Sequence, residues 1–178
     1  MGTENPWQAQ VVEGLRAAGL KIGGYTDAGQ NGASVMDFGG APDYEIDTKL
    51  ASIGTLAGYP SWVLCNYGIN DSDWPGLTQA GFEAAYAYIV DAIHARWPYA
   101  TVYLTIPWGN GSDVWSDTVA VWIGNVIAAR STFCAAGSDE RAWFKPNVAA
   151  YSTDGLHWNA TTAGNAAGAA ANLTSMGY

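Results

Sequence analysis

Two short apolar runs rich in β-forming residues, at 59–71 and 99–111, alternate with segments of helical periodicity at 78–98 and 113–133. Each apolar run is closed by glycine or proline, which end regular structure. Strands separated by helices of this length predict βαβ crossovers and a parallel sheet that helices cover on both faces. No other feature of the sequence constrains the fold as strongly.

The same alternation extends toward both ends of the chain. Near the N-terminus, Pro6 suits the first turn of a helix and Gly19 suits its end, so we expect a helix there and then a short strand around residues 20–25. Toward the C-terminus we expect an extended stretch within residues 143–152, then a loop, and an alanine-rich helix over about residues 160–175.

Composition sets the number of domains and excludes some partners. The chain has 178 residues, of which 49% are apolar, so we expect a single domain over residues 1–178. Its net charge of -9 would repel nucleic acid and anionic lipid headgroups, so neither is an expected partner. The sequence has no apolar stretch long enough to span a membrane and no signal-peptide layout, which predicts a soluble chain. Compartment and oligomeric state stay open.

The two cysteines, Cys65 and Cys134, lie in or beside apolar runs. They lack the spacing of metal ligands, so we expect buried free thiols, with a disulfide as the alternative. No metal and no cofactor is expected.

Parallel sheets carry their sites at the carboxyl ends of strands, which directs attention to the loop "STDGLHWN". Asp154 and His157 are three residues apart at the entry to the last helix, so one turn can bring the carboxylate to the imidazole Nδ1. That contact would leave Nε2 able to act as a base. The alternative is an aspartate that caps the helix beside an ordinary surface histidine.

Two further loops belong to the same edge of the predicted sheet. Asn70 comes directly after a buried strand, where its amide could donate to developing negative charge or could simply form a turn. Gly32, in "GQNGAS", would let its backbone N–H approach a substrate closely, or is only a turn glycine. Each pattern is weak alone, but their shared position strengthens all three.

Together these motifs resemble those of the SGNH hydrolases, also called GDSL-type esterases and lipases. "GQNGAS" is similar to the second family block, "GIND" to the third and "DGLH" to the fifth. The resemblance implies a flavodoxin-like, three-layer α/β/α fold and hydrolysis of carboxylic or acetyl esters through an acyl-serine intermediate. It also implies that His157 is the general base and that Asp154 orients it. Gly32 N–H and the Asn70 side chain would then be the oxyanion donors.

The chain departs from the family pattern at the nucleophile. The family's serine lies in a Gly-Asp-Ser block after the first strand, and the sequence contains no Gly-Asp-Ser. Gly2 and Thr3 resemble the tail of that block, so we expect an N-terminally incomplete domain whose serine and first strand lie upstream of Met1. Ser34 is expected to be a helix N-cap and Thr3 would be poorly held, so neither replaces the serine. His94 is expected to be a helix residue with its polar atoms satisfied, partly buried or at the surface.

The aromatic content bears on the substrate. The chain has nine Trp and ten Tyr, and such rings either stack on sugars or fill cores. Trp74, Trp108 and Trp158 flank the expected site and would suit a carbohydrate ester, although core filling is the simpler interpretation. We therefore expect a hydrolase of a small-molecule ester or an acetylated carbohydrate. The alternative is a noncatalytic carbohydrate- or ligand-binding module that kept the cleft and lost the nucleophile.

Overall fold

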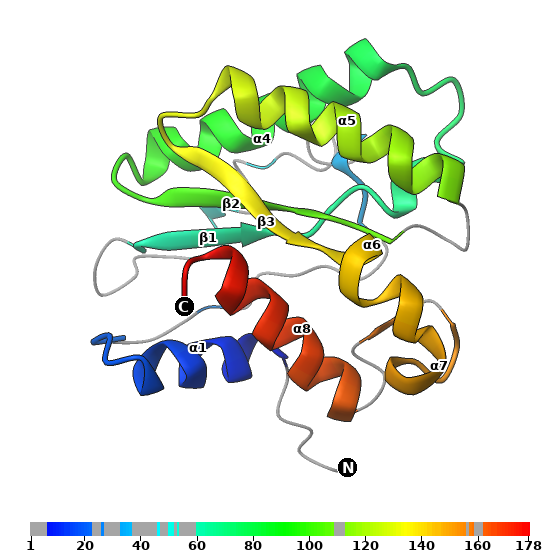
Figure 1. Cartoon of the computed structure of the whole chain (residues 1–178). Coiled ribbons are helices and arrows are strands. Elements are labelled where there is room, and N and C mark those ends of the chain that lie inside the picture. Colours follow the sequence, from blue (N-terminus) through cyan, green and yellow to red (C-terminus); the bar gives the residue numbers. More distant parts are fainter. Residues whose placement is uncertain are drawn as a thin grey trace. The chain divides into compact units, whose positions relative to one another are not determined.

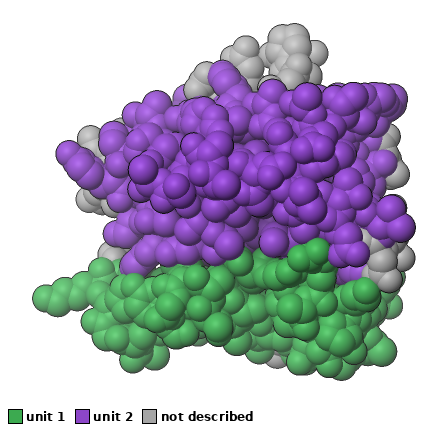
Figure 2. All heavy atoms as spheres, turned by 45° about the horizontal axis from the view of Figure 1, so that its top comes forward, with its two compact units in different colours: residues 1–27, 137–178 green, residues 28–136 purple. Residues whose placement is uncertain are grey.

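A computed structural model of the chain describes residues 7–22, 26, 33–36, 46, 50–51, 53, 60–108, 113–155, 157–158 and 162–178. These residues form a mixed α/β structure (Figure 1). The chain divides into two compact units, which Figure 2 shows in different colours: residues 28–136, and residues 1–27 with 137–178. The expectation of a single domain stays a prediction.

The described residues form a sheet of three strands, in the order β1 (Trp62–Cys65), β2 (Thr101–Ile106) and β3 (Cys134–Asp139). β1 and β2 pair in parallel, with Trp62 opposite Thr101 and Cys65 opposite Leu104. The predicted α/β class with a parallel sheet is therefore confirmed. The finer expectation, a flavodoxin-like fold of the SGNH type, stays a prediction.

Two long helices pack on the sheet in the unit of residues 28–136. α4 (Gln79–Arg96) and α5 (Asp113–Ala129) contact each other and β2, and both lie above the sheet in the view of Figure 1. α4 begins at the N-cap Thr78, whose side chain accepts a hydrogen bond from the Gly81 N–H. The apolar side chains of α4 recur at helical spacing, so one face of the helix is buried. The fully buried members of this core include Phe82, Tyr86, Ile89, Val102, Leu104, Val119 and Ile123.

The other unit contains the two terminal helices. α1 (Trp7–Ala17) and α8 (Thr162–Ser175) pack against each other. Gly19 lies just beyond the end of α1, as predicted, and its φ of 90° is one that only glycine adopts readily. The Gly19 N–H donates to Arg16 O at 3.0 Å and the Leu20 N–H donates to Leu15 O at 3.1 Å, a paired closure typical of helix C-termini.

Two predictions of extended structure are wrong where the structure can be compared with them. Residues 20–22 are not in a strand, and residues 23–25 lie outside the described part of the chain. The segment 143–152, predicted to be extended, is mostly helical. It holds the end of α6 (Glu140–Trp143), the 3-10 helix η2 (Lys145–Asn147) and α7 (Val148–Tyr151).

The third strand of the sheet is instead β3, with the sequence CAAGSD. Alanine, glycine, serine and aspartate have low β propensity, so the sequence gives little sign of a strand there. Pairing with β2 decides its conformation, because tertiary contacts override a weak local preference.

Two further expectations concern the cysteines and the membrane. Cys65 and Cys134 are both free and buried, which confirms the expectation of buried thiols. Among the residues that the structure describes, none of the helices has both the length and the apolar character needed to cross a bilayer.

Candidate active site

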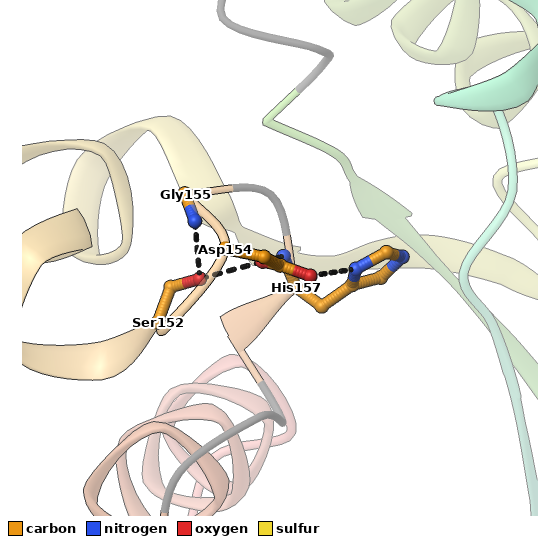
Figure 3. Close-up of polar contacts among 4 residues, drawn as sticks. All are labelled: Ser152, Asp154, Gly155 and His157. Atoms are coloured by element: carbon orange, nitrogen blue, oxygen red, sulfur yellow. Dashed lines mark hydrogen bonds and ion pairs between the residues drawn. The ribbon is translucent and has the colours of Figure 1, made fainter.

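Asp154 and His157 meet in the loop between α7 and α8 (Figure 3). Nδ1 of His157 lies 2.6 Å from Oδ2 of Asp154, and the backbone N–H of His157 donates to Oδ1 at 2.8 Å. A carboxylate only accepts hydrogen bonds, so this contact places the imidazole proton on Nδ1. The predicted contact is present, while the catalytic roles of the two residues stay a prediction.

The pair is open to solvent. The side chain of His157 is 55% exposed and that of Asp154 is 48% exposed. In Figure 3 the second ring nitrogen of His157, Nε2, is directed away from the carboxylate. No hydrogen bond joins Nε2 to any residue of the described part of the chain. The imidazole can therefore accept a proton at Nε2 from a molecule that approaches the loop.

Ser152 lies on the other side of the carboxylate from the imidazole. Its Oγ donates to Asp154 Oδ1 at 2.9 Å and accepts a hydrogen bond from the Gly155 N–H at 2.9 Å. Gly155 has a φ of 78°, which lets the chain turn tightly between Asp154 and His157. The Ser152 hydroxyl donates its hydrogen bond to Asp154 and not to His157, so it is not arranged as a nucleophile activated by the histidine.

Trp158, directly after His157, anchors the loop in the interior of its unit. It is only 6% exposed, and its Nε1–H donates to Glu140 Oε1 at 2.7 Å. The Trp158 ring lies 5.2 Å, centroid to centroid, from the rings of both Trp7 and Trp143. Core filling, the simpler interpretation of this tryptophan, is thus confirmed.

Two glycines of α8 make room for Trp158. A methyl group at Gly168 would overlap the Trp158 ring, and one at Gly164 would overlap the Trp158 carbonyl oxygen. The "GNAAG" spacing puts both glycines on one face of the helix, four residues apart. The last helix therefore fixes the position of the residue that follows His157.

Asn70 stands at the start of η1 (Asn70–Asp73), the short 3-10 helix that follows β1. Its Nδ2 donates to the backbone oxygen of Ala33 at 2.9 Å. A primary amide has two N–H donors, so this bond orients the side chain and uses one of them. Gly32, the other predicted oxyanion donor, lies outside the described residues.

Asp71 is a structural residue of this region that the sequence analysis missed. It is fully buried, and its carboxylate accepts hydrogen bonds from the backbone N–H groups of Val35 (2.9 Å) and Met36 (3.1 Å). Val35 and Met36 are helical residues directly after Ser34, so Asp71 satisfies backbone donors at the start of that turn. Together with Asn70, it ties the segment 33–36 to η1. An acidic residue in the segment that follows a buried strand was the signal in the sequence, but it does not identify the backbone groups that the carboxylate accepts from.

Of the residues considered as a substitute nucleophile or a second base, Ser34 and His94 can be compared with the structure. Ser34 is 2% exposed, and Thr3 lies outside the described residues. The His94 ring stacks on Phe133 with centroids 3.8 Å apart and planes inclined by 11°, and His94 is partly buried in α4 as expected. The expectation that its polar atoms are satisfied is wrong for Nδ1, which is buried and has no hydrogen-bond partner among the described residues. Trp108 is 8% exposed and so also belongs to the interior. The described residues include no group of three or more His, Cys, Asp or Glu side chains suited to hold a metal ion.

The structure thus brings Asp154 and His157 together within one unit and places Asn70 in the other, the unit of residues 28–136. No family model matches the chain, and searches of curated proteins and of solved structures gave no significant match. The resemblance in motifs is therefore the basis for any family assignment.

Proposed function

We propose that this chain supplies the catalytic base and an oxyanion donor of an ester hydrolase of the SGNH type. The substrate would be a carboxylic or acetyl ester of a small molecule or carbohydrate. The observation that carries the proposal is the 2.6 Å contact between His157 Nδ1 and Asp154 Oδ2, in a pair whose Nε2 is directed away from the carboxylate. This is the arrangement that a general base next to a serine requires.

The proposed reaction has two steps. In the first, His157 Nε2 takes the proton of a serine hydroxyl as the serine oxygen attacks the ester carbonyl, and then gives that proton to the departing alcohol. In the second, His157 takes a proton from water as the water attacks the acyl-serine, and returns it to the serine as the acid leaves. Asp154 holds the Nδ1 proton and stabilises the imidazolium in both steps.

Asn70 would stabilise the negative charge that develops on the carbonyl oxygen in each step. Its hydrogen bond to Ala33 O at 2.9 Å holds the amide in one orientation. The second N–H of the amide would donate a hydrogen bond to the oxyanion. The resemblance assigns the backbone N–H of Gly32 to the same task. The serine itself is outside residues 1–178 in this proposal, since the resemblance places it in a Gly-Asp-Ser block before Met1.

The test compares two forms of the protein: residues 1–178, and the same residues preceded by those that the natural coding sequence specifies upstream. We expect little hydrolysis of a short-chain aryl ester by the first form, because a base and oxyanion donors alone leave only residual catalysis. The second form should hydrolyse the ester and react with a fluorophosphonate at a serine upstream of Met1. Hydrolysis by residues 1–178 with labelling of Ser34 or Ser152 would contradict the assignment.

A noncatalytic binding module is the rival, and the lack of Gly-Asp-Ser in the sequence is the observation in its favour. The burial of Trp108 and Trp158 removes two of the three rings that could have stacked on a sugar. If the protein is a binding module, the longer form should bind an acetylated carbohydrate without hydrolysing it. The same two proteins therefore distinguish the two functions.

A further inference from the structure

We infer that Ser152 is a positioning residue, which holds the Asp154 carboxylate in the orientation that His157 needs. The inference concerns the geometry of the loop, and its importance for catalysis rests on the proposed function. Ser152 was not among the residues that the sequence motifs singled out. Its place on the far side of Asp154 from the imidazole is visible in Figure 3.

The hydrogen bonds of the carboxylate define its orientation. Oδ1 accepts from Ser152 Oγ at 2.9 Å and from the His157 backbone N–H at 2.8 Å, while Oδ2 faces Nδ1 at 2.6 Å. A rotation of the carboxylate that moved Oδ2 away from the ring would break the bonds on Oδ1 as well. Ser152 therefore resists that rotation from the side opposite to the histidine.

The hydroxyl of Ser152 is itself fixed in direction. The Gly155 N–H donates to Oγ at 2.9 Å, and the carboxylate can only accept, so the hydroxyl proton points to Asp154. Ser152 accepts from one backbone group of the loop and donates to the side chain that contacts the base.

Burial explains why a serine is needed at this position. An exposed carboxylate and imidazole order each other weakly, because water competes for both groups and two side chains must be immobilised. Asp154 and His157 are both about half exposed, whereas Ser152 is only 9% exposed. Water competes less for a hydroxyl in that environment, so the ordering of the pair comes from the buried end of the loop.

The test reads the histidine tautomer in residues 1–178 by nitrogen NMR of protein labelled in its imidazole rings. The chain has two histidines, so the spectrum contains two rings and His157→Ala assigns them. At mildly alkaline pH, where imidazole is neutral, we expect His157 to carry its proton on Nδ1. Ser152→Ala should lower the ratio of the Nδ1–H to the Nε2–H tautomer by about two- to tenfold, the range that one net hydrogen bond is worth.

Two further variants separate positioning from general loosening. Ser152→Thr keeps the hydroxyl and should keep the tautomer ratio. Ser175→Ala removes a hydroxyl that donates to Asn172 O at 2.8 Å in the same unit, and should leave the His157 ring unchanged. An unchanged ratio in Ser152→Ala, or an equal change in Ser175→Ala, would overturn the inference. If Ser152→Ala does not fold, Ser152→Cys takes its place, because a thiol is a much weaker donor.

This readout needs no nucleophile, so it is independent of the proposed function. A tautomer shift in Ser152→Ala together with a lack of ester hydrolysis in the longer form would support the positioning role and contradict the hydrolase. If the longer form does hydrolyse esters, Ser152→Ala should lower kcat by a similar two- to tenfold with little change in KM, because Ser152 does not touch the substrate in this proposal.

Discussion

The two histidines of the chain occupy opposite environments. The side chain of His157 is 55% exposed and faces the carboxylate of Asp154. His94, in α4, is stacked on the ring of Phe133. The Nδ1 atom of His94 is buried and has no hydrogen-bond partner among the described residues. A general base needs an orienting partner and access to the substrate, and of the two only His157 has both.

Replacement of each histidine by alanine tests this difference. In the form that hydrolyses esters, we expect His157→Ala to lower kcat/KM by at least about a hundredfold, the smallest effect usual for loss of a general base. His94→Ala should lower kcat/KM little, because its ring stacks on Phe133 and its buried Nδ1 has no hydrogen-bond partner among the described residues. The measurement is the initial rate on a short-chain aryl ester, and equal losses in the two variants would disprove the role of the 152–158 loop.

Local spacing explains which parts of the candidate site could be predicted. Asp154 and His157 are three residues apart, so a single turn is enough to bring them together. Ser152 and Asp71 were missed because their roles depend on the direction of a hydroxyl and on backbone donors 36 residues distant. Such partners have no periodic pattern in a sequence.

Among the elements, the helices and strands with strong periodicity or strong β propensity were predictable. α1, α4, α5, α8, β1 and β2 all fall within or close to the expected ranges. β3 was missed because its small residues have low β propensity, and the short helices after it are too brief to show a helical period. The predicted fold class did not depend on β3, since two strands and their connecting helices already indicate a parallel sheet.

The fit of Trp158 against α8 gives a prediction about stability. Gly168→Ala should lower the free energy of unfolding by about 1–3 kcal/mol, because the new methyl group overlaps the buried Trp158 ring. Gly124→Ala is the matched control in α5, where a Cβ would meet nothing within 4 Å. There the helix propensity of alanine should raise stability by about 0.5–1 kcal/mol. Urea unfolding measures both changes, and a neutral Gly168→Ala would disprove the tight contact.

The link between η1 and the segment 33–36 gives a second prediction at this scale. Asp71→Ala should lower the free energy of unfolding by at least about 2 kcal/mol, because it leaves two backbone N–H groups without their buried acceptor. Asp91→Ala is the control: Asp91 also accepts two hydrogen bonds, from Arg130, but its side chain is 51% exposed.

An exposed ion pair contributes about 0–1 kcal/mol, so the control should cost much less than the Asp71 variant in the same urea titration. Equal costs would show that Asp71 does not hold the segment. If Asp71→Ala costs more than Asp91→Ala, we also expect faster amide hydrogen exchange at Val35 and Met36 in the Asp71→Ala variant.

For the molecule as a whole, buried weak acids predict how stability depends on pH. Burial raises the pKa of Cys65 from 9.0 to about 12 and that of Cys134 from 9.0 to about 11. Burial also raises the pKa of Tyr67 and of Tyr86 above the ordinary tyrosine value. All four groups are neutral in the folded chain and ionise more readily in the unfolded chain. Their contribution to the free energy of unfolding is complete below pH 9, and it is lost as the pH rises toward the pKa values of the folded chain.

We therefore expect the free energy of unfolding to fall as pH rises above about 9, by up to about 1.4 kcal/mol per pH unit for each cysteine. Urea titrations over a series of alkaline buffers measure the slope. Cys134→Ala should make the decline shallower than in the unaltered protein, whatever its effect at neutral pH. A stability that is constant or rises between neutral pH and about pH 11 would contradict the prediction.

The hydrogen bonds that join Asp154 to Ser152 and to His157 span only two and three residues of the sequence. Asn70, in contrast, obtains its orientation from Ala33, 37 residues away. Closing a short loop costs little chain entropy, and contacts of low sequence separation form quickly during folding. The contacts within the acid–base pair are thus local, and a circular permutation that opens the chain outside this loop should preserve them as long as Trp158 stays packed. The amide donor depends on the correct assembly of distant segments and would be the first part of the site to be lost.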